Sequence, residues 1–184
     1  MATGVRYLAL LRGVNVGGKN LVRMADLRET FEGIGFDEVG TYIASGNVLF
    51  RAPREKRELM AARLESELSV RFGIELKVVL LTKAQLKGVV EGAPRGFGAD
   101  TDRCDVLFLR KPLTAARAFA AIEAKEGVDR VWKGKRVIYL SRLAARASSS
   151  RISRFVMRPE YQNVTIRSWS TTRKLLARMD SAAE

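Results

Sequence analysis

The sequence predicts an α+β protein, and three observations lead to that class. Short apolar runs alternate with segments in which apolar residues recur every three or four positions, as in strands alternating with amphipathic helices. Clusters of glycine, proline and asparagine separate these segments. The order of strands and helices in the first half begins again in the second. A chain of 184 residues fits one large domain or two small ones.

The amino-terminal half begins with a strand, a helix and a hairpin. The apolar run Val5 to Leu11 predicts a buried strand. Apolar residues recur at helical spacing from Met24 to Ile34, and Gly35 stands where a left-handed residue would end that helix. The turn-forming triplet after Val39 to Ala44 predicts a hairpin with the strand Val48 to Phe50.

A second helix and a fourth strand complete this half. Pro53 can begin a helix whose apolar face runs from Met60 to Phe72 and ends at Gly73. Ile74 to Leu81 is again an apolar strand. The resulting order of strand, helix, strand, strand, helix and strand is the split βαβ arrangement of a ferredoxin-like plait.

The second half repeats the beginning of this pattern. Residues 1–92 form the first half with a linking helix over Thr82 to Val90, residues 93–102 are a linker, and residues 103–184 form the second half. The predicted elements are strand Cys104 to Leu109, helix Thr114 to Ala124, hairpin Val128 to Trp132 with Arg136 to Leu140, helix Ser148 to Met157, strand Val164 to Ile166 and helix Ser170 to Met179. The sequence therefore predicts two tandem ferredoxin-like half-domains, the second modified, with a C-terminal helix.

Composition excludes several classes of chemistry. The chain has no histidine, which removes Ser-His-Asp and Cys-His catalysis and every histidine-based metal site. Cys104 is the only cysteine, so no intramolecular disulfide can form and no thiolate cluster can hold a metal. We therefore expect no cofactor, no metal site and a cytoplasmic location. Asp100, Asp102 and Asp105 are expected to be solvated, or to balance the charge of Arg103.

The charge distribution points to anionic ligands. The net charge is +13, and residues 103–184 carry 18 basic and 7 acidic side chains, against 15 and 13 in residues 1–102. Such an excess produces a positive field that attracts phosphate-bearing molecules. Of the 33 basic residues 23 are arginine, so an arginine-rich composition explains part of the excess but not the scarcity of acidic residues.

A glycine loop follows the first strand and could cradle an anion. Arg12, Asn15, Gly17, Gly18 and Lys19 combine cations with backbone N–H groups freed by glycine. The spacing matches neither the dinucleotide-binding fingerprint nor the P-loop. The glycines could equally well serve a tight structural turn.

Two further segments carry candidate ligand-binding residues. Ser45 and Asn47 could place a hydroxyl and an amide at the same sheet end as the glycine loop, although such triplets are common hairpin turns. Arg151 and Arg154 lie with three serines at a predicted helix N-terminus, where an anion would be favoured, although a simple serine cap gives the same pattern.

Four parts of the sequence carry a resemblance to a known family: Leu10 to Asn20, Met24 with Leu27, Tyr42 to Val48, and a closing motif that includes Arg167 and Trp169. In these parts the chain resembles the family called domain of unknown function 1697. The resemblance implies plait-like α/β subdomains and no established activity, substrate or cofactor, so no catalytic residue is carried over. It also suggests that the glycine loop, the Ser-Gly-Asn turn and the Thr-Arg-Trp region form one pocket, although packing could explain them equally well.

At Ser168 and Ser170 the chain departs from this family, in which asparagines usually flank the tryptophan.

Three classes of function stay open. The leading hypothesis is a binding protein for phosphate-bearing ligands, either nucleic acid or a nucleotide, acting through the basic second half. The alternatives are a small-molecule enzyme with its pocket at the glycine loop and Ser-Gly-Asn turn, and an oligomerisation module that pairs sheet edges. We expect no membrane partner, and a monomer or weak homodimer.

Overall fold

The computed structural model describes residues 4–181. Contacts divide the chain into two compact units, one of residues 4–85 with 178–181 and the other of residues 86–177. The segment 93–102 lies inside the second unit.

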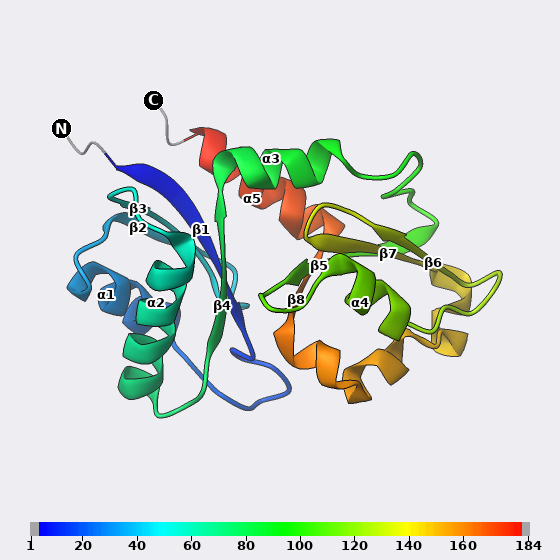
Figure 1. Ribbon diagram of the computed structural model, residues 1–184, viewed down its shortest axis with the longest axis horizontal. Coiled ribbons are helices and arrows are strands. Elements are labelled where there is room, and N and C mark those ends of the chain that lie inside the picture. Colours follow the sequence, from blue (N-terminus) through cyan, green and yellow to red (C-terminus); the bar gives the residue numbers. More distant parts are fainter. Residues whose placement is uncertain (1–3, 182–184) are drawn as a thin grey trace. The chain divides into compact units, whose positions relative to one another are not determined.

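The first unit contains one four-stranded antiparallel sheet and two helices on one face of it (Figure 1). Its strands lie in the order β2-β3-β1-β4, with β1 paired to both β3 and β4. The elements are β1 (Val5–Arg12), α1 (Met24–Gly33), β2 (Asp37–Tyr42), β3 (Asn47–Ala52), α2 (Arg57–Phe72) and β4 (Lys77–Thr82).

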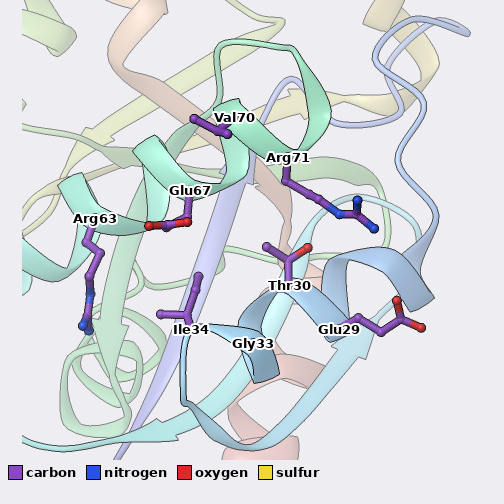
Figure 2. Close-up of a pocket in the computed structure, with 8 residues that line it drawn as sticks. All are labelled: Glu29, Thr30, Gly33, Ile34, Arg63, Glu67, Val70 and Arg71. Carbon is purple, nitrogen blue, oxygen red and sulfur yellow. The ribbon is translucent and has the colours of Figure 1, made fainter.

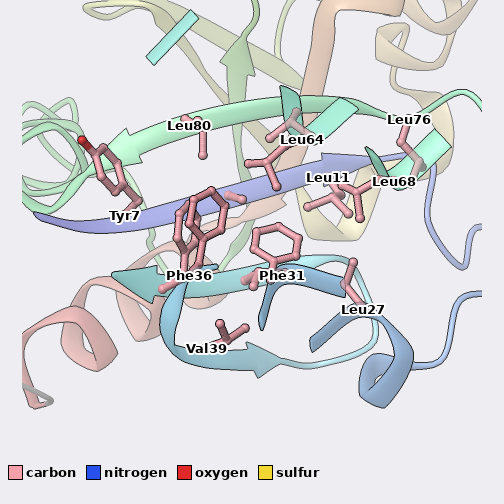
Figure 3. Close-up of a cluster of buried hydrophobic side chains, with 14 of the residues drawn as sticks. Tyr7, Leu11, Leu27, Phe31, Phe36, Val39, Leu64, Leu68, Leu76 and Leu80 are labelled. Carbon is pink, nitrogen blue, oxygen red and sulfur yellow. The ribbon is translucent and has the colours of Figure 1, made fainter. Parts of the chain in front are cut away.

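The core of this unit lies between the sheet and its two helices (Figure 3). Side chains alternate along a strand, so Tyr7 and Leu11 of β1 point to the helical face, where Tyr7 stacks on Phe50 with ring centroids 5.7 Å apart. The helices bury a stripe of apolar residues against them, including Phe31 of α1 and Leu64 of α2.

The helix ends follow the sequence except at the start of α2. Gly35 and Gly73 both have positive φ, as expected of residues that end a helix. The expected start at Pro53 is wrong, because α2 begins at Arg57, with Lys56 as its N-cap. Arg57 lies one turn before Met60, the first residue of the helix that is buried.

The second unit contains another four-stranded antiparallel sheet, in the order β6-β7-β5-β8. Helix α4 packs on one face of it, where Ala118 joins a cluster of buried residues from β5 and β7. The remaining elements are α3 (Lys83–Glu91), β5 (Asp102–Leu109), α4 (Ala115–Ala121), β6 (Asp129–Lys133), β7 (Val137–Leu143), β8 (Val164–Ser168) and α5 (Trp169–Ser181).

The predicted helix over Ser148 to Met157 is wrong. Three 3-10 turns occupy this region, η1 (Ala144–Ser149), η2 (Ile152–Met157) and η3 (Pro159–Asn163). Serine hydroxyls compete with helical hydrogen bonding here, because the Ser150 hydroxyl accepts from the Ile152 N–H at 3.2 Å. The buried pair in η2, Ile152 and Phe155, is spaced by three residues, as suits a 3-10 turn.

The coarse prediction is confirmed: this is an α+β protein with two four-stranded antiparallel sheets and a C-terminal helix. Within residues 4–181, no helix is both long and apolar enough to cross a membrane.

Candidate functional site

The side chain of Asn15 forms hydrogen bonds that connect the glycine loop to the backbone of neighbouring segments. Its amide nitrogen donates to the carbonyl of Ala44 at 2.8 Å and to that of Val22 at 2.9 Å. Its amide oxygen accepts from the N–H of Val22 at 2.8 Å. Both amide hydrogens are therefore engaged, and the positive φ of 54° at Asn15 is held by these bonds. Asn15 brings the glycine loop and the segment before the Ser-Gly-Asn turn together.

Gly17 and Gly18 form the exposed tip of the loop. Their φ values are 58° and 75°, and the Lys19 N–H donates to the Val16 carbonyl at 3.0 Å, which closes a tight hairpin turn. Two consecutive positive φ values explain why two glycines stand here. The Lys19 side chain is exposed, and so is that of Val16.

The Ser-Gly-Asn turn packs directly against the end of β1. Asn47 is buried, and its amide nitrogen donates to the Tyr42 carbonyl and to the Ser45 hydroxyl, each at 2.9 Å. The Gly46 carbonyl accepts from the Leu11 N–H at 2.8 Å. A Cβ on Gly46 would lie 2.9 Å from the Cβ of Leu11, so a side chain does not fit. The glycine loop and the Ser-Gly-Asn turn therefore lie next to each other, as predicted. The side-chain amides of Asn15 and Asn47 form hydrogen bonds with backbone groups and with the Ser45 hydroxyl.

Arg12 lies half-buried at the end of β1, opposite Lys77 of β4. Lys77 lies 3.8 Å from Glu75, so its charge is balanced by a neighbouring carboxylate.

A groove of about 750 Å³ lies between α1 and α2 (Figure 2). Glu29 and Glu67 contribute negative charges to it, and Arg63 and Arg71 contribute positive charges. The charges of the lining balance, and Arg63 already pairs with Glu55 at 3.2 Å. This groove therefore has no preference for an anion.

The three arginines predicted in the second half have different environments. Arg151 is exposed, and its backbone N–H donates to Asp129 at 3.0 Å. Arg154 is exposed and lies 3.3 Å from Glu123, which Arg158 also approaches at 2.7 Å.

Arg167 is buried in β8, where it donates to the Ile166 carbonyl at 2.8 Å. Burial lowers the pKa of Arg167 to about 10. Arg151 and Arg154 do not lie at the N-terminus of an α-helix, because 3-10 turns replace the helix expected there.

The acidic residues at the start of β5 are paired with arginines of other strands. Asp102 accepts from Arg130 and from the Ser141 hydroxyl, and Asp105 accepts from Arg142. The expectation that these residues are solvated or balance Arg103 is therefore wrong for both. The hydrogen bond from Ser141 lowers the pKa of Asp102, whereas burial raises the pKa of Asp105 against the opposing effect of Arg142.

Basic side chains gather at the opposite end of β5, which we name the basic end of the second sheet: Arg110, Lys111, Lys133, Lys135 and Arg136. The Leu109 N–H donates to the Arg136 carbonyl at 3.2 Å, so the end of β5 and the β6–β7 turn adjoin. Sequence reasoning counted these charges without singling them out. The motif Lys-Gly-Lys-Arg in a predicted hairpin turn was the available signal.

Two cavities of about 460 Å³ each lie in the second unit, and both are lined by Asp105 and Arg142. The first is also lined by residues of η1 and η2, including Ser148 and Ser153. The second is also lined by the loop that contains Gly98 and by the start of α5.

Ser168 and Trp169 have structural roles at the start of α5. The Ser168 hydroxyl accepts from the Thr171 N–H at 3.2 Å and thereby caps the helix. Asparagine caps helices as well as serine does, so the departure from the family pattern at Ser168 preserves this role. Trp169 packs edge to face on Phe97, with ring centroids 5.1 Å apart.

These features define the chain as an α+β protein with two sheets of equivalent strand order. Residues 5–139 match the family described as protein of unknown function (DUF1697), and the chain belongs to that family. The solved structure of a conserved bacterial protein from Streptococcus pneumoniae is similar to it, at 30% identity over 96% of this chain and 98% of that one, with a TM-score of 0.82. Comparison with curated proteins gave no match.

Proposed function

We propose that the protein binds phosphate-bearing ligands, in particular nucleic acid, through the basic end of the second sheet. The observation that carries the proposal is the cross-strand pairing at this end, where Leu109 bonds to Arg136 at 3.2 Å and thereby adjoins two basic segments. Neither residues 109–112 nor residues 133–137 contain an acidic side chain. A row of phosphates suits a set of cations that adjoining segments bring close together.

The charge of the second unit supports the same function. Residues 86–177 hold 19 basic and 8 acidic side chains, whereas the remainder of the chain holds 14 and 12. Nearly all of the net charge therefore belongs to one unit. A field of this kind draws polyanions towards that unit and makes their binding depend on salt.

An aromatic ring lies beside the basic end. Phe119 of α4 is 39% exposed, and the Lys133 ammonium lies 5.5 Å from the centre of its ring. A nucleobase can stack on an exposed ring while adjacent cations hold the backbone. This combination favours a single strand over a duplex, because only an unpaired base presents its face.

The finer fold assignment belongs to the same proposal. We infer that each unit is a ferredoxin-like half-domain, since the orders β2-β3-β1-β4 and β6-β7-β5-β8 are equivalent. The second half-domain is modified, because 3-10 turns replace the helix expected between β7 and β8.

The test is fluorescence anisotropy with a labelled 20-nucleotide single strand and a duplex of the same sequence, titrated between low salt and about 0.2 M NaCl. We expect affinity to fall linearly on a double-logarithmic plot against salt. The double variant Lys135→Glu/Arg136→Glu should weaken binding at least tenfold. It should also reduce the magnitude of the salt slope by about two, one for each lost phosphate contact.

The matched control is Arg54→Glu/Lys56→Glu in the first unit. Both pairs are exposed, and each double variant lowers the net charge of +13 by four. Equal weakening by the two variants would show that only total charge matters and would contradict a site at the basic end. No binding by the unaltered protein at low salt would contradict the proposal altogether.

A further inference from the structure

The two sheets can be compared position by position, and the comparison singles out an ion pair. Tyr7 of β1 pairs with Phe50 and Thr82 in the neighbouring strands. Asp105 of β5 pairs with Leu140 of β7 and Ser168 of β8. The two positions are equivalent, because each is the first residue of its central strand that pairs with both neighbouring strands. By the same register, Arg142 of β7 is equivalent to Ala52 of β3. The second sheet thus carries Asp105 and Arg142 where the first carries the buried residues Tyr7 and Ala52.

The layer that covers this position also differs between the units. In the first unit the segment between β3 and β4 is the 16-residue helix α2, whose Met60, Leu64 and Leu68 fill the face of the sheet. In the second unit the segment between β7 and β8 consists of the turns η1, η2 and η3. These short turns leave a cavity of about 460 Å³ above the sheet.

The cavity has an apolar floor, a polar rim and one charged corner. Leu107, Leu140 and Phe155 contribute to the floor, and Ser148 and Ser153 contribute hydroxyls to the rim. Neither of these hydroxyls bonds to another residue in the part of the chain that the structure describes. Asp105 and Arg142 complete the lining. Small-molecule sites combine the same elements in cavities of about 300 to 1,000 Å³.

The ion pair itself is incompletely satisfied. The side chains of Asp105 and Arg142 are 18% and 30% exposed. The Arg142 Nε is buried and has no hydrogen-bond partner among the residues described. An anion can therefore reach this guanidinium only through its exposed part, where a carboxylate or phosphate oxygen can accept a charge-assisted hydrogen bond. Burial raises the pKa of Asp105, against the opposing effect of Arg142.

We propose that this cavity is a binding site for a small amphipathic anion, whose apolar body lies on the floor formed by Leu107, Leu140 and Phe155 and whose carboxylate or phosphate group binds Arg142. An anion is favoured over a cation because the unit carries 19 basic and 8 acidic side chains. The site is separate from the basic end, since Asp105 and Arg142 lie towards one end of β5 and β7 and Arg110 and Arg136 lie beyond the other. The proposal does not depend on nucleic-acid binding.

The test uses four simple probes on the full chain. Benzoate and phenyl phosphate carry an apolar ring with the two alternative anionic groups, benzyl alcohol lacks the charge, and inorganic phosphate lacks the ring. Isothermal titration calorimetry gives the affinities, and amide chemical shifts of ¹⁵N-labelled protein locate the binding. We expect benzoate or phenyl phosphate to bind at least tenfold more tightly than benzyl alcohol and inorganic phosphate, with the largest shifts at residues 138–142 and 148–156. The tighter of the two aromatic anions identifies the anionic group.

Two variants and a matched control decide the role of Arg142. Arg142→Met should weaken binding of the preferred aromatic anion at least tenfold. Arg130→Met breaks the comparable Asp102 pair of the same sheet, but Arg130 does not line either cavity, so binding should stay within twofold. Should Arg142→Met fail to fold, Ser153→Phe keeps the ion pair and places a ring in the cavity, and it should abolish binding.

Three results would overturn the proposal. They are equal affinity for benzyl alcohol and the aromatic anions, largest shifts at residues 109–111 and 133–136, and unchanged binding by Ser153→Phe.

Discussion

Replacing Gly46 by alanine tests whether close packing of the Ser-Gly-Asn turn against the end of β1 stabilises the fold. Gly46 has a φ of 73°, a conformation that costs an alanine about 1 kcal/mol. The added Cβ would also lie 2.9 Å from Leu11 Cβ and 3.4 Å from Val14 Cβ, and both residues are buried. Crowding of a packed core costs a further 1 to 3 kcal/mol or so. We therefore expect Gly46→Ala to lower the free energy of unfolding by about 2 to 4 kcal/mol.

Gly17→Ala is the matched control. Gly17 has a similar φ of 58°, but a Cβ there would meet no atom within 4 Å. This variant carries the conformational cost alone, about 1 kcal/mol. The difference between the two variants measures how closely the turn approaches the end of β1.

Urea unfolding followed by far-ultraviolet circular dichroism measures both losses. The only two tryptophans, Trp132 and Trp169, belong to the second unit, so their fluorescence distinguishes unfolding of that unit from unfolding of the first. An equal decrease in the free energy of unfolding for Gly46→Ala and Gly17→Ala would refute the reasoning. It would mean that the chain around Leu11 shifts to accept the added Cβ at no energetic cost.

Three further predictions concern single side chains. Lys19→Met should change the free energy of unfolding by less than about 0.5 kcal/mol, because the side chain is exposed; a larger change in urea unfolding would contradict this. Tyr139→Phe should cost about 1 to 2 kcal/mol in unfolding followed by tryptophan fluorescence, since the buried hydroxyl donates to the Val89 carbonyl at 2.6 Å; a neutral result would count against that bond. The Ser141 hydroxyl lowers the pKa of Asp102, so its carboxylate stabilises the fold above about pH 4 and loses this effect as the pH falls through the lowered value. Burial raises the pKa of Asp105, whose contribution is instead largest in acid and falls as the pH rises through the raised value. Asp102→Asn should therefore lower the free energy of unfolding more at pH 7 than in acid, whereas Asp105→Asn should lower it less at pH 7 than in acid. Urea unfolding at several pH values measures both effects, and the same trend with pH for both variants would contradict the prediction.

Much of the fold could be predicted because its signals are local. A continuous apolar run such as Val5 to Leu11 indicates a buried strand, and Gly35 and Gly73 end their helices through a conformation that glycine adopts easily. The proximity of the glycine loop to the Ser-Gly-Asn turn was also predictable, since both follow strands that end at the same side of the sheet. The role of that proximity could not be predicted. An asparagine amide can donate equally well to a ligand or to a backbone carbonyl, and only the structure shows that Asn15 donates to the Ala44 carbonyl.

The region after β7 shows why local signals are insufficient. Residues 148–157 have serines and apolar spacing that suit a helix start, and the structure instead forms 3-10 turns. Asp129, 22 residues earlier in the chain, accepts from the Arg151 N–H, so this N–H bonds to a distant side chain rather than to a carbonyl of the preceding turn. Periodicity within the segment carries no information about such a partner.

The residue pattern alone indicates the α+β class, the two groups of strands and helices, and the concentration of positive charge in the second half. Which charges meet depends on the three-dimensional fold. Asp105 and Arg142 are 37 residues apart and become neighbours through the register of β5 against β7. The basic end arises in the same way, because Leu109 pairs with Arg136. The physical reason is that composition sets the amount of charge, whereas strand register, which is fixed by packing of the whole sheet, sets the distances over which those charges act.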